Sequence, residues 1–240
     1  MYIYFSGIGG VGLGPLAEVA LGAGHIVSGS DTHSSSMTDQ LTKAGVSVSF
    51  DQSGANLVAV HAAKPIDWLV YTAGLPADHP ELVTAKKLKI HISKRDELLN
   101  QIINESGQKL LAVAGTHGKT TTTAMLVWTL KQLGYTVSYS IGTAVSFGPS
   151  GYFHPSAHFF VYECDEFDRN FLQFHPHLSL ITSLDYDHPD TYADQKDYSE
   201  AFTKFIDQSD HTIIWQRDAL LTGVQTPLSA WRLNDAEVMD

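Results

Sequence analysis

Two glycine-rich turns, at residues 7–12 and 115–120, constrain the fold of this chain more than any other feature. Each turn follows a short apolar run that is typical of a buried strand and precedes a run with helical spacing. In a parallel α/β unit, glycines at this point allow a tight turn, so that backbone amides at the start of the helix can face a phosphate group. The sequence therefore predicts two α/β units in tandem.

Short apolar runs alternate with helical patterns along the chain, which indicates parallel sheets with helices on both faces. A polar break at residues 104–108 divides the pattern. We therefore expect an α/β fold, with an N-terminal Rossmann-like parallel-sheet domain over residues 1–105 and a central P-loop-type α/β ATPase domain over residues 106–240. The expected strands are 2–6, 25–30, 67–71, 89–92, 109–114, 136–141, 158–163, 178–182 and 211–215, and the expected helices are 15–23, 95–104, 120–133 and 198–208.

The charge balance and the single cysteine narrow the classes of function. The chain has 26 acidic and 15 basic side chains, a formal net charge of −11, whereas a non-specific nucleic-acid binder needs a basic face. Cys164 stands alone, which excludes an intramolecular disulfide and fits a reducing compartment. The N-terminus lacks the features of a signal peptide, and no apolar run approaches the roughly 20 residues that span a bilayer. We expect a cytoplasmic protein that binds neither nucleic acid nor membranes.

The first turn, Gly7-Ile8-Gly9-Gly10-Val11-Gly12, has the spacing G-x-G-x-x-G. Asp31 ends the next predicted strand, 19 residues after Gly12, where a carboxylate can accept hydrogen bonds from a ribose or a base. This pattern predicts a site for a nucleotide diphosphate. It leaves open whether the ligand is NAD, FAD or a UDP-sugar. The alternative is a turn that only packs its helix against the sheet, with Asp31 as a solvated acid.

The second turn carries the stronger signal, because Gly118-Lys119-Thr120 is the core of a phosphate-binding loop. The loop has the short form G-T-H-G-K-T, and Val113 stands where the longer form has a glycine. We expect its amides to surround the phosphates of ATP, with Lys119 at the β- and γ-phosphates and the Thr120 hydroxyl on Mg²⁺. The expected ATP-binding residues are Gly115, Thr116, His117, Gly118, Lys119, Thr120 and Thr121.

Acidic clusters follow two of the predicted strands in the second unit. One is Glu163-Cys164-Asp165-Glu166 and the other is Asp185-Tyr186-Asp187-His188-Pro189-Asp190. Because the carboxyl ends of parallel strands share one edge of a sheet, both clusters are expected beside the phosphate loop. Mg²⁺ prefers hard oxygen ligands, so Glu163 is the first metal-binding candidate, and His188 is a candidate for a second cation or a phosphate. The alternative is a pair of solvated turns.

Together these motifs resemble the Mur ligase family, the ATP-dependent amino-acid ligases of peptidoglycan precursor synthesis. The phosphate loop with its threonine run, the E-C-D-E cluster and the run Asp187-His188-Pro189-Asp190-Thr191-Tyr192 carry the resemblance, which covers essentially the whole chain. The histidine within the loop and the D-H-x-D-T-Y run are similar to the branch that joins L-alanine to UDP-N-acetylmuramate. The resemblance implies that the muramate carboxylate attacks the γ-phosphate of ATP and that L-alanine then displaces phosphate from the acyl phosphate.

The resemblance also implies roles for individual residues. Lys119, Glu163 and His188 would act in catalysis, and Thr120, Glu163 and His188 would hold metal ions. Asp31 and Thr72 would lie near the uridine of the UDP-sugar. The residues near its diphosphate would be Gly9, Gly10, Val11 and Gly12.

Three departures from the family pattern stand out. Ser183 replaces the usual asparagine before the D-x-D-H run, and Cys164 replaces the usual alanine of E-A-D-E. Family members also carry a C-terminal domain that closes over ATP, and this chain ends about where that domain would begin. We therefore expect the 240 residues to bind nucleotides but to be nearly inactive alone.

Other functions stay open at this point. A murein-peptide ligase, which attaches a recycled tripeptide to UDP-N-acetylmuramate, would share these motifs. A nucleotide-binding module without catalysis would need no cation site beside Lys119. An NAD-dependent oxidoreductase would explain the first turn and leave the phosphate loop unexplained. Oligomeric state is not encoded in any of these patterns.

Overall fold

A computed structural model describes residues 1–72, 74–222 and 230–233 of the chain. The chain divides into two compact units: one comprises Met1–Glu105 and Gly142–Pro155, and the other comprises Ser106–Ile141 and Ser156–Asp240. The sequence predicts that residues 142–155 belong to the second domain, whereas the structure groups them with the first. The reason is a long-range contact, since the Gly151 amide donates a hydrogen bond of 2.7 Å to the Glu18 carboxyl group on the first helix.

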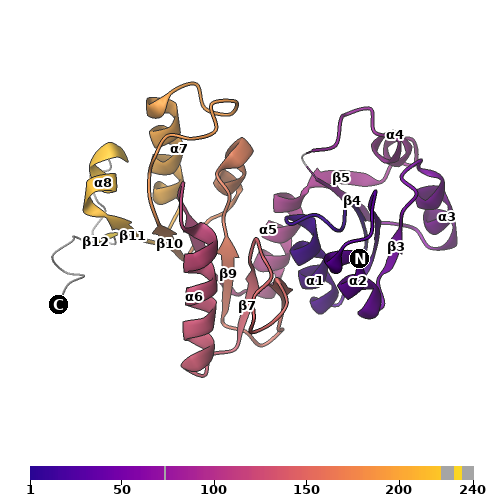
Figure 1. Cartoon of the computed structure of the whole chain (residues 1–240), viewed down its shortest axis with the longest axis horizontal. Helices are drawn as coiled ribbons and strands as arrows, with labels where there is room; N and C mark the ends of the chain where they lie inside the picture. The colour runs from indigo at the N-terminus through magenta and orange to yellow at the C-terminus, as the bar shows by residue number, and fades with distance from the viewer. Residues whose placement is uncertain (73, 223–229, 234–240) are drawn as a thin grey trace. The chain divides into compact units, whose positions relative to one another are not determined.

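The first unit is built on a five-stranded sheet in the order β3-β2-β1-β4-β5, with every pair parallel (Figure 1). Strand β1 is central and entirely apolar or small, because both faces of a parallel sheet are covered. The strand order reverses between β1 and β4, which is where α/β sheets bind ligands. The strands are β1 (Tyr2–Ser6), β2 (Ile26–Ser30), β3 (Ser47–Ser49), β4 (Trp68–Tyr71) and β5 (His91–Lys94).

Helices connect these strands, and three of them are absent from the sequence expectations. Helix α2 begins with a capping box in which Ser35 and Thr38 bind each other's backbone amides. Helix α4 begins with Pro80 at its first turn, and Lys89 adopts φ 56° after its end, so β5 starts two residues later than expected. The helices are α1 (Leu13–Gly22), α2 (Ser36–Lys43), α3 (Ala55–Ala63), α4 (Pro80–Lys87) and α5 (Arg95–Ser106).

The second unit is also built on a parallel sheet whose first strand, β6, lies in the middle, but there β9 and not the next strand, β7, lies beside it. Six of its strands lie in the order β12-β11-β10-β6-β9-β7, all paired in parallel. These strands are β6 (Lys109–Ala114), β7 (Val137–Ser140), β9 (Phe159–Glu163), β10 (Leu178–Ile181), β11 (His211–Trp215) and β12 (Ala230–Leu233). The helices are α6 (Lys119–Gln132), α7 (Gln195–Asp207) and α8 (Gln216–Thr222), with a 3₁₀ segment at Phe167–Gln173, and β8 (Gly151–Tyr152) lies in the stretch that groups with the first unit.

The expected fold class is confirmed: both units are α/β structures around parallel sheets. Among the described residues, no helix is both long and apolar enough to cross a bilayer. Cys164 is fully buried just after β9 and fills space in the core as a small apolar side chain.

Candidate functional site

The phosphate loop connects the end of β6 to the start of α6. Gly115 and Gly118 have φ values of 128° and 82°, which L side chains rarely adopt. A Cβ atom on Gly115 would also collide with the Thr182 hydroxyl and the Ser183 backbone. Both glycines are therefore required by the backbone path. The loop encloses a cavity of about 370 Å³ that is lined by Thr116, His117, Gly118, Lys119, Thr120 and Thr121.

Lys119 turns back over the loop and pairs with a buried acid. Its Nζ atom lies 2.6 Å from the carbonyl oxygen of Gly115 and 2.9 Å from the Glu166 carboxyl group. Glu166 is fully buried. Burial raises the pKa of Glu166, and the neighbouring Lys119 ammonium acts in the opposite direction. The Lys119 ammonium is therefore held over the phosphate loop by the Gly115 carbonyl oxygen and the Glu166 carboxyl group.

Glu163 lies at the end of β9, where it is the register partner of Val113 on β6. This pairing places its carboxyl group beside the start of α6, and the Thr120 hydroxyl donates a hydrogen bond of 2.6 Å to Glu163 Oε1. A hydroxyl and a carboxylate at this distance form a pair of hard oxygen ligands, which fits Mg²⁺ bound together with phosphate oxygens and water. The structure therefore brings together two of the three residues that were expected to hold metal.

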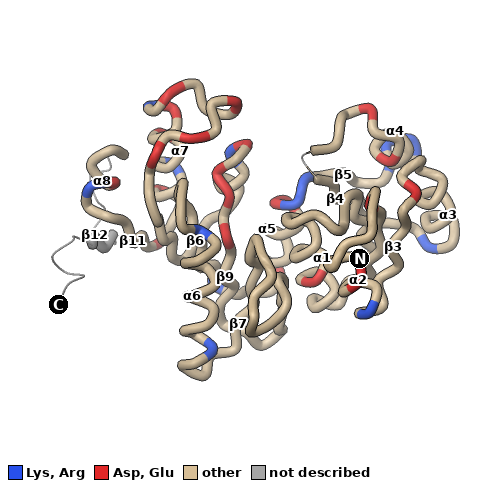
Figure 2. The backbone as a smooth tube through the Cα atoms, viewed as in Figure 1, with Lys and Arg blue, Asp and Glu red and all other residues tan. Residues whose placement is uncertain are grey.

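His188 meets a different acid of the same cluster. Its Nε2 atom lies 3.8 Å from Glu166 Oε1, and its ring contacts that of Phe167. His188 has φ 56°, a left-handed conformation that is costly for a residue with a Cβ atom. Figure 2 shows acidic residues along the segment after β9 and along the loop between β10 and α7. Within the described residues, no group of three or more histidine, cysteine and acidic side chains is arranged to hold a metal.

Side chains and backbone groups from α7 and from the loop between β10 and α7 form hydrogen bonds that hold the phosphate loop in place. The Thr116 hydroxyl donates to the carbonyl oxygen of Asp185 at 2.7 Å and lies 2.8 Å from the Tyr198 hydroxyl on α7. Burial raises the pKa of Tyr198, so this hydroxyl keeps its proton and can donate to Thr116. Ser183, which stands where the family usually has asparagine, accepts from the His117 amide at 3.0 Å. This serine is therefore part of the support for the loop.

The sequence predicts a role for Glu163 but none for Glu166. Glu166 contacts both Lys119 and His188, and the Tyr192 hydroxyl donates to its carbonyl oxygen at 2.6 Å. The only signal was its place in the E-C-D-E cluster. The 3₁₀ segment that turns Glu166 toward Lys119 has no periodic pattern.

The first turn is held by its own neighbours. Gly7 has φ 91°, and the amides of Gly7 and Ile8 donate to the carbonyl oxygen of Ser30 at 2.8 and 2.9 Å. The Gly9 amide donates to Asp31 Oδ2 at 2.7 Å. Asp31, which directly follows β2, therefore contacts the backbone of the turn itself. A Cβ atom on Gly7 would lie 2.9 Å from Thr72 Cγ2, so Thr72 borders the same turn.

The expected residues of the diphosphate site lie at the start of α1. Gly12 is the residue before the helix, and Gly10 and Val11 are exposed, Val11 to 79%. In the first turn of α1 the Gly14 amide donates to the carbonyl oxygen of Gly10 at 2.8 Å and Pro15 has no amide hydrogen, so the amides of residues 11–13 are the candidates for anion binding at this helix N-terminus. The structure thus brings residues 9–12, Asp31 and Thr72 to one edge of the first sheet.

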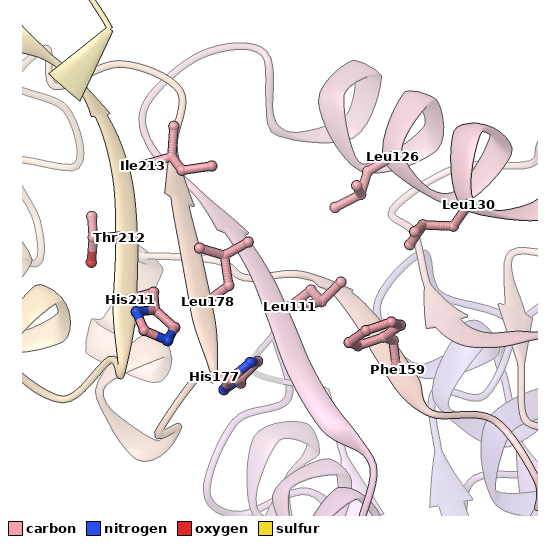
Figure 3. A pocket seen from close by; sticks show the side chains of 9 residues that line it. All are labelled: Leu111, Leu126, Leu130, Phe159, His177, Leu178, His211, Thr212 and Ile213. Atoms are coloured by element: carbon pink, nitrogen blue, oxygen red, sulfur yellow. The ribbon is translucent and has the colours of Figure 1, made fainter. Parts of the chain in front are cut away.

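A larger hollow in the second unit is apolar and lies elsewhere. It has a volume of about 540 Å³, and its side chains come from α6 and from β6, β9, β10 and β11 (Figure 3). Leu178 and His211 are the first residues of their strands, so this hollow lies toward the amino ends of the strands, opposite the phosphate loop. Its lining contains neither lysine nor arginine.

Comparisons with known proteins agree with this arrangement. The model of the Mur ligase family catalytic domain matches residues 2–106, and the model of the Mur ligase middle domain matches residues 113–230. The UDP-N-acetylmuramate–L-alanine ligase of Salinispora arenicola is 38% identical over 87% of this chain and 39% of its own length. The ligase of the same name from Thermosynechococcus vestitus is 34% identical over 88% of this chain and 44% of its own length. The chain thus spans less than half of these relatives.

Solved structures show the same likeness. The UDP-N-acetylmuramate–alanine ligase of Thermotoga maritima superimposes with a TM-score of 0.82 at 29% identity, over 92% of this chain and 50% of that one. The UDP-N-acetylmuramate:L-alanyl-γ-D-glutamyl-meso-diaminopimelate ligase of Neisseria meningitides gives a TM-score of 0.83 at 26% identity, over 97% of this chain and 76% of that one. Both family models and both structures span the two units that carry the glycine turns. The chain belongs to the Mur ligase family.

Proposed function

We propose that this chain forms the UDP-sugar-binding and ATP-binding part of a ligase that joins L-alanine to UDP-N-acetylmuramate in peptidoglycan precursor synthesis. The observation that carries the proposal is the convergence of Lys119, Thr120 and Glu163 at the carboxyl edge of the second sheet. The first unit offers a separate diphosphate site at its own glycine turn. The names of the relatives with 34–38% identity support the choice of sugar nucleotide and amino acid. Such an enzyme works in the cytoplasm.

The residues of the loop have distinct tasks in this proposal. The backbone amides of residues 115–121 bind the phosphates of ATP, and Lys119 neutralises charge at the β- and γ-phosphates. Thr120 and Glu163 would hold Mg²⁺, with His188 as the candidate for a second cation. Mg²⁺ supplies charge neutralisation on the phosphate oxygens when it is bound. Because phosphoryl transfer depends mostly on positioning and charge, these side chains need no covalent role.

The proposed reaction has two steps. A carboxylate oxygen of the muramate forms a bond to the γ-phosphorus while the bond to the bridging oxygen of ADP breaks, which gives an acyl phosphate. The amine of L-alanine then attacks the acyl carbon through a tetrahedral intermediate, phosphate leaves with the electron pair of its C–O bond, and the nitrogen loses a proton. Because the attack depends on positioning, the turn at residues 7–12 with Asp31 and Thr72 would hold the UDP-sugar that carries the reacting carboxylate.

A second candidate is a murein-peptide ligase that attaches a tripeptide to UDP-N-acetylmuramate. The likeness to the Neisseria structure, whose name describes such a ligase, favours it. The two candidates share the sugar nucleotide and ATP and differ only in the amine substrate. ATP turnover, measured with L-alanine and with the tripeptide on a longer protein that contains this chain, would distinguish the two candidates.

Calorimetric titration of the 240-residue chain tests the proposal directly. We expect UDP-N-acetylmuramate and MgATP to bind, each in the presence of the other. We expect L-alanine-dependent ATP turnover to be very slow, because the named relatives are more than twice as long as this chain. Titration with EDTA present should weaken ATP binding. Tight binding of NAD with no response to the UDP-sugar would favour an oxidoreductase, and binding of ATP alone would favour a nucleotide-binding module.

A further inference from the structure

A buried carboxyl group lies beneath the first glycine turn and has no role in the proposed chemistry. Glu81, in the first turn of α4, is fully buried inside the first unit. It accepts hydrogen bonds from three buried hydroxyls: Tyr4 at 2.8 Å, Ser30 at 2.7 Å and Ser6. Placing a carboxyl group and three hydroxyls in a core is costly, and apolar side chains could fill the same volume. A satisfied polar network, however, fixes the geometry of its members.

Two of these hydroxyls belong to the residues that directly precede the proposed UDP-sugar site. Ser6 is the last residue of β1 and leads into Gly7, while Ser30 is the last residue of β2 and leads into Asp31. The two serines are register partners in the sheet. The Glu81 carboxyl group therefore links the carboxyl ends of β1 and β2.

The backbone of Ser30 also forms hydrogen bonds with the turn at residues 7–12. Its carbonyl oxygen accepts from the amides of Gly7 and Ile8, and the following residue, Asp31, accepts from the Gly9 amide. A shift of the Ser30 backbone would therefore move three of the hydrogen bonds that shape the turn. Gln52 adds a further hydrogen bond of 3.1 Å to the Ser30 hydroxyl, so the serine is held from two sides.

We propose that Glu81 is a positioning residue for the sugar-nucleotide site, which sets the ends of β1 and β2 and thereby the turn at residues 7–12 and Asp31. This inference rests on the proposed function, because it assigns the UDP-sugar to that turn. It assigns no contact between Glu81 and the ligand. The Tyr4 hydroxyl, which lies farther back on β1, contributes to the network without touching the turn.

Two measurements on the whole chain test this role, with Glu81→Gln as the variant. In the ligand-free protein, amide hydrogen exchange at Gly7, Ile8 and Gly9, followed by NMR, should become about tenfold faster. The Kd for UDP-N-acetylmuramate should rise about five- to tenfold, while the Kd for MgATP stays within about twofold. Tyr4→Phe is the matched control: it removes one hydroxyl donor to Glu81 but keeps the links from Ser6 and Ser30, and it should leave both the exchange of the three amides and the UDP-sugar Kd nearly unchanged.

The possible outcomes separate this inference from the proposed function. Unchanged exchange and unchanged UDP-sugar affinity in Glu81→Gln would overturn the positioning role, and so would faster exchange with unchanged affinity. Equal effects of Glu81→Gln and Tyr4→Phe would also overturn it, because the network would then only stabilise the fold. If the unsubstituted chain binds no UDP-sugar, the proposed function is wrong, and so is the assignment of the UDP-sugar to the turn at residues 7–12. The exchange data would still show whether Glu81 holds the backbone of that turn. Should Glu81→Gln not fold, Ser30→Ala, which keeps the carbonyl oxygen and removes the hydroxyl, provides the same test.

Discussion

The two glycine turns occupy equivalent places in their sheets, but different side chains surround them. Each turn follows a central strand and opens a helix. At the first turn, the nearby polar groups form hydrogen bonds with the backbone of the turn, as the Gly9 amide does when it donates to Asp31. At the second turn, the Lys119 ammonium pairs with the Glu166 carboxyl group, and the Thr120 hydroxyl donates a hydrogen bond to Glu163. A turn that only binds needs a fixed backbone, whereas a turn that supports phosphoryl transfer also needs charge at the reacting phosphate.

Removal of the cation at the second turn should have the largest effect and separate the two sites most clearly. In Lys119→Ala, we expect MgATP binding to weaken by about 100-fold or more, since charge at the β- and γ-phosphates is lost, while UDP-N-acetylmuramate binding stays within a few-fold. Calorimetry with each ligand measures both. Lys196→Ala, at a lysine that is 85% exposed in the same unit, serves as the control. Loss of both ligands together in Lys119→Ala would mean that the two turns do not act as separate sites.

The converse change concerns the first turn. Asp31→Ala removes the acceptor of the Gly9 amide and the carboxylate expected near the uridine, so UDP-N-acetylmuramate binding should weaken by about tenfold to thirtyfold with MgATP binding unchanged. The exposed Glu105, at the end of α5, provides a control as Glu105→Ala. An Asp31→Ala protein that binds the UDP-sugar normally would show that the carboxylate serves the backbone alone.

A smaller effect is expected at the hydroxyl beside Glu163. Thr120→Val keeps the shape of the side chain and removes the oxygen proposed for Mg²⁺, and we expect about a tenfold loss of affinity for MgATP with little change for ATP in EDTA. Thr120→Ser should restore most of the affinity. The control is Thr129→Val, at an exposed position of the same helix. Equal losses with and without Mg²⁺ would indicate that the hydroxyl supports the loop and not the metal.

The smallest expected effect is a change in the pH dependence of stability at Glu18, whose carboxyl group accepts hydrogen bonds from Ser150 and Gly151. Burial raises the pKa of Glu18 above its ordinary value of 4.5, against the opposing hydrogen bonds from Gly151, Ser150 and Gln40. The folded state therefore retains this proton more strongly than the unfolded state, so the contribution of Glu18 to the free energy of unfolding falls as pH rises from about 4.5 through the raised pKa, and is constant above it.

Glu18→Gln should remove this component of the pH dependence. Denaturant unfolding between about pH 4 and pH 7 would measure it, with the exposed Glu97→Gln as the control. A pH dependence identical in Glu18→Gln and in the unsubstituted chain would show that Glu18 does not titrate differently in the two states.

The sequence predicts the parts of the molecule that depend on local patterns. Buried strands and glycine turns have such patterns, and the rule that parallel strands end at one edge is enough to place Glu163 near Thr120. The partner of Lys119 depends instead on the 3₁₀ segment that follows Glu166, and no periodicity marks it. The sequence does not predict α2 and α3, because both helices are short and bury few side chains: Thr38 and Leu41 in α2, and Leu57 in α3.

The return of residues 142–155 to the first unit limits how the protein can be dissected. Gly151 lies so close to the backbone of Pro15 that a Cβ atom there would clash, and a Cβ atom on Gly22 would make a tight contact of 3.1 Å with Phe153 Cβ. A fragment that stops at Glu105 would leave this side of α1 uncovered, because its partner is encoded downstream of the phosphate loop. Separate expression of a sugar-nucleotide half would thus require grafting that later stretch onto it, and a protease cut after residue 105 would leave two pieces that still share one core.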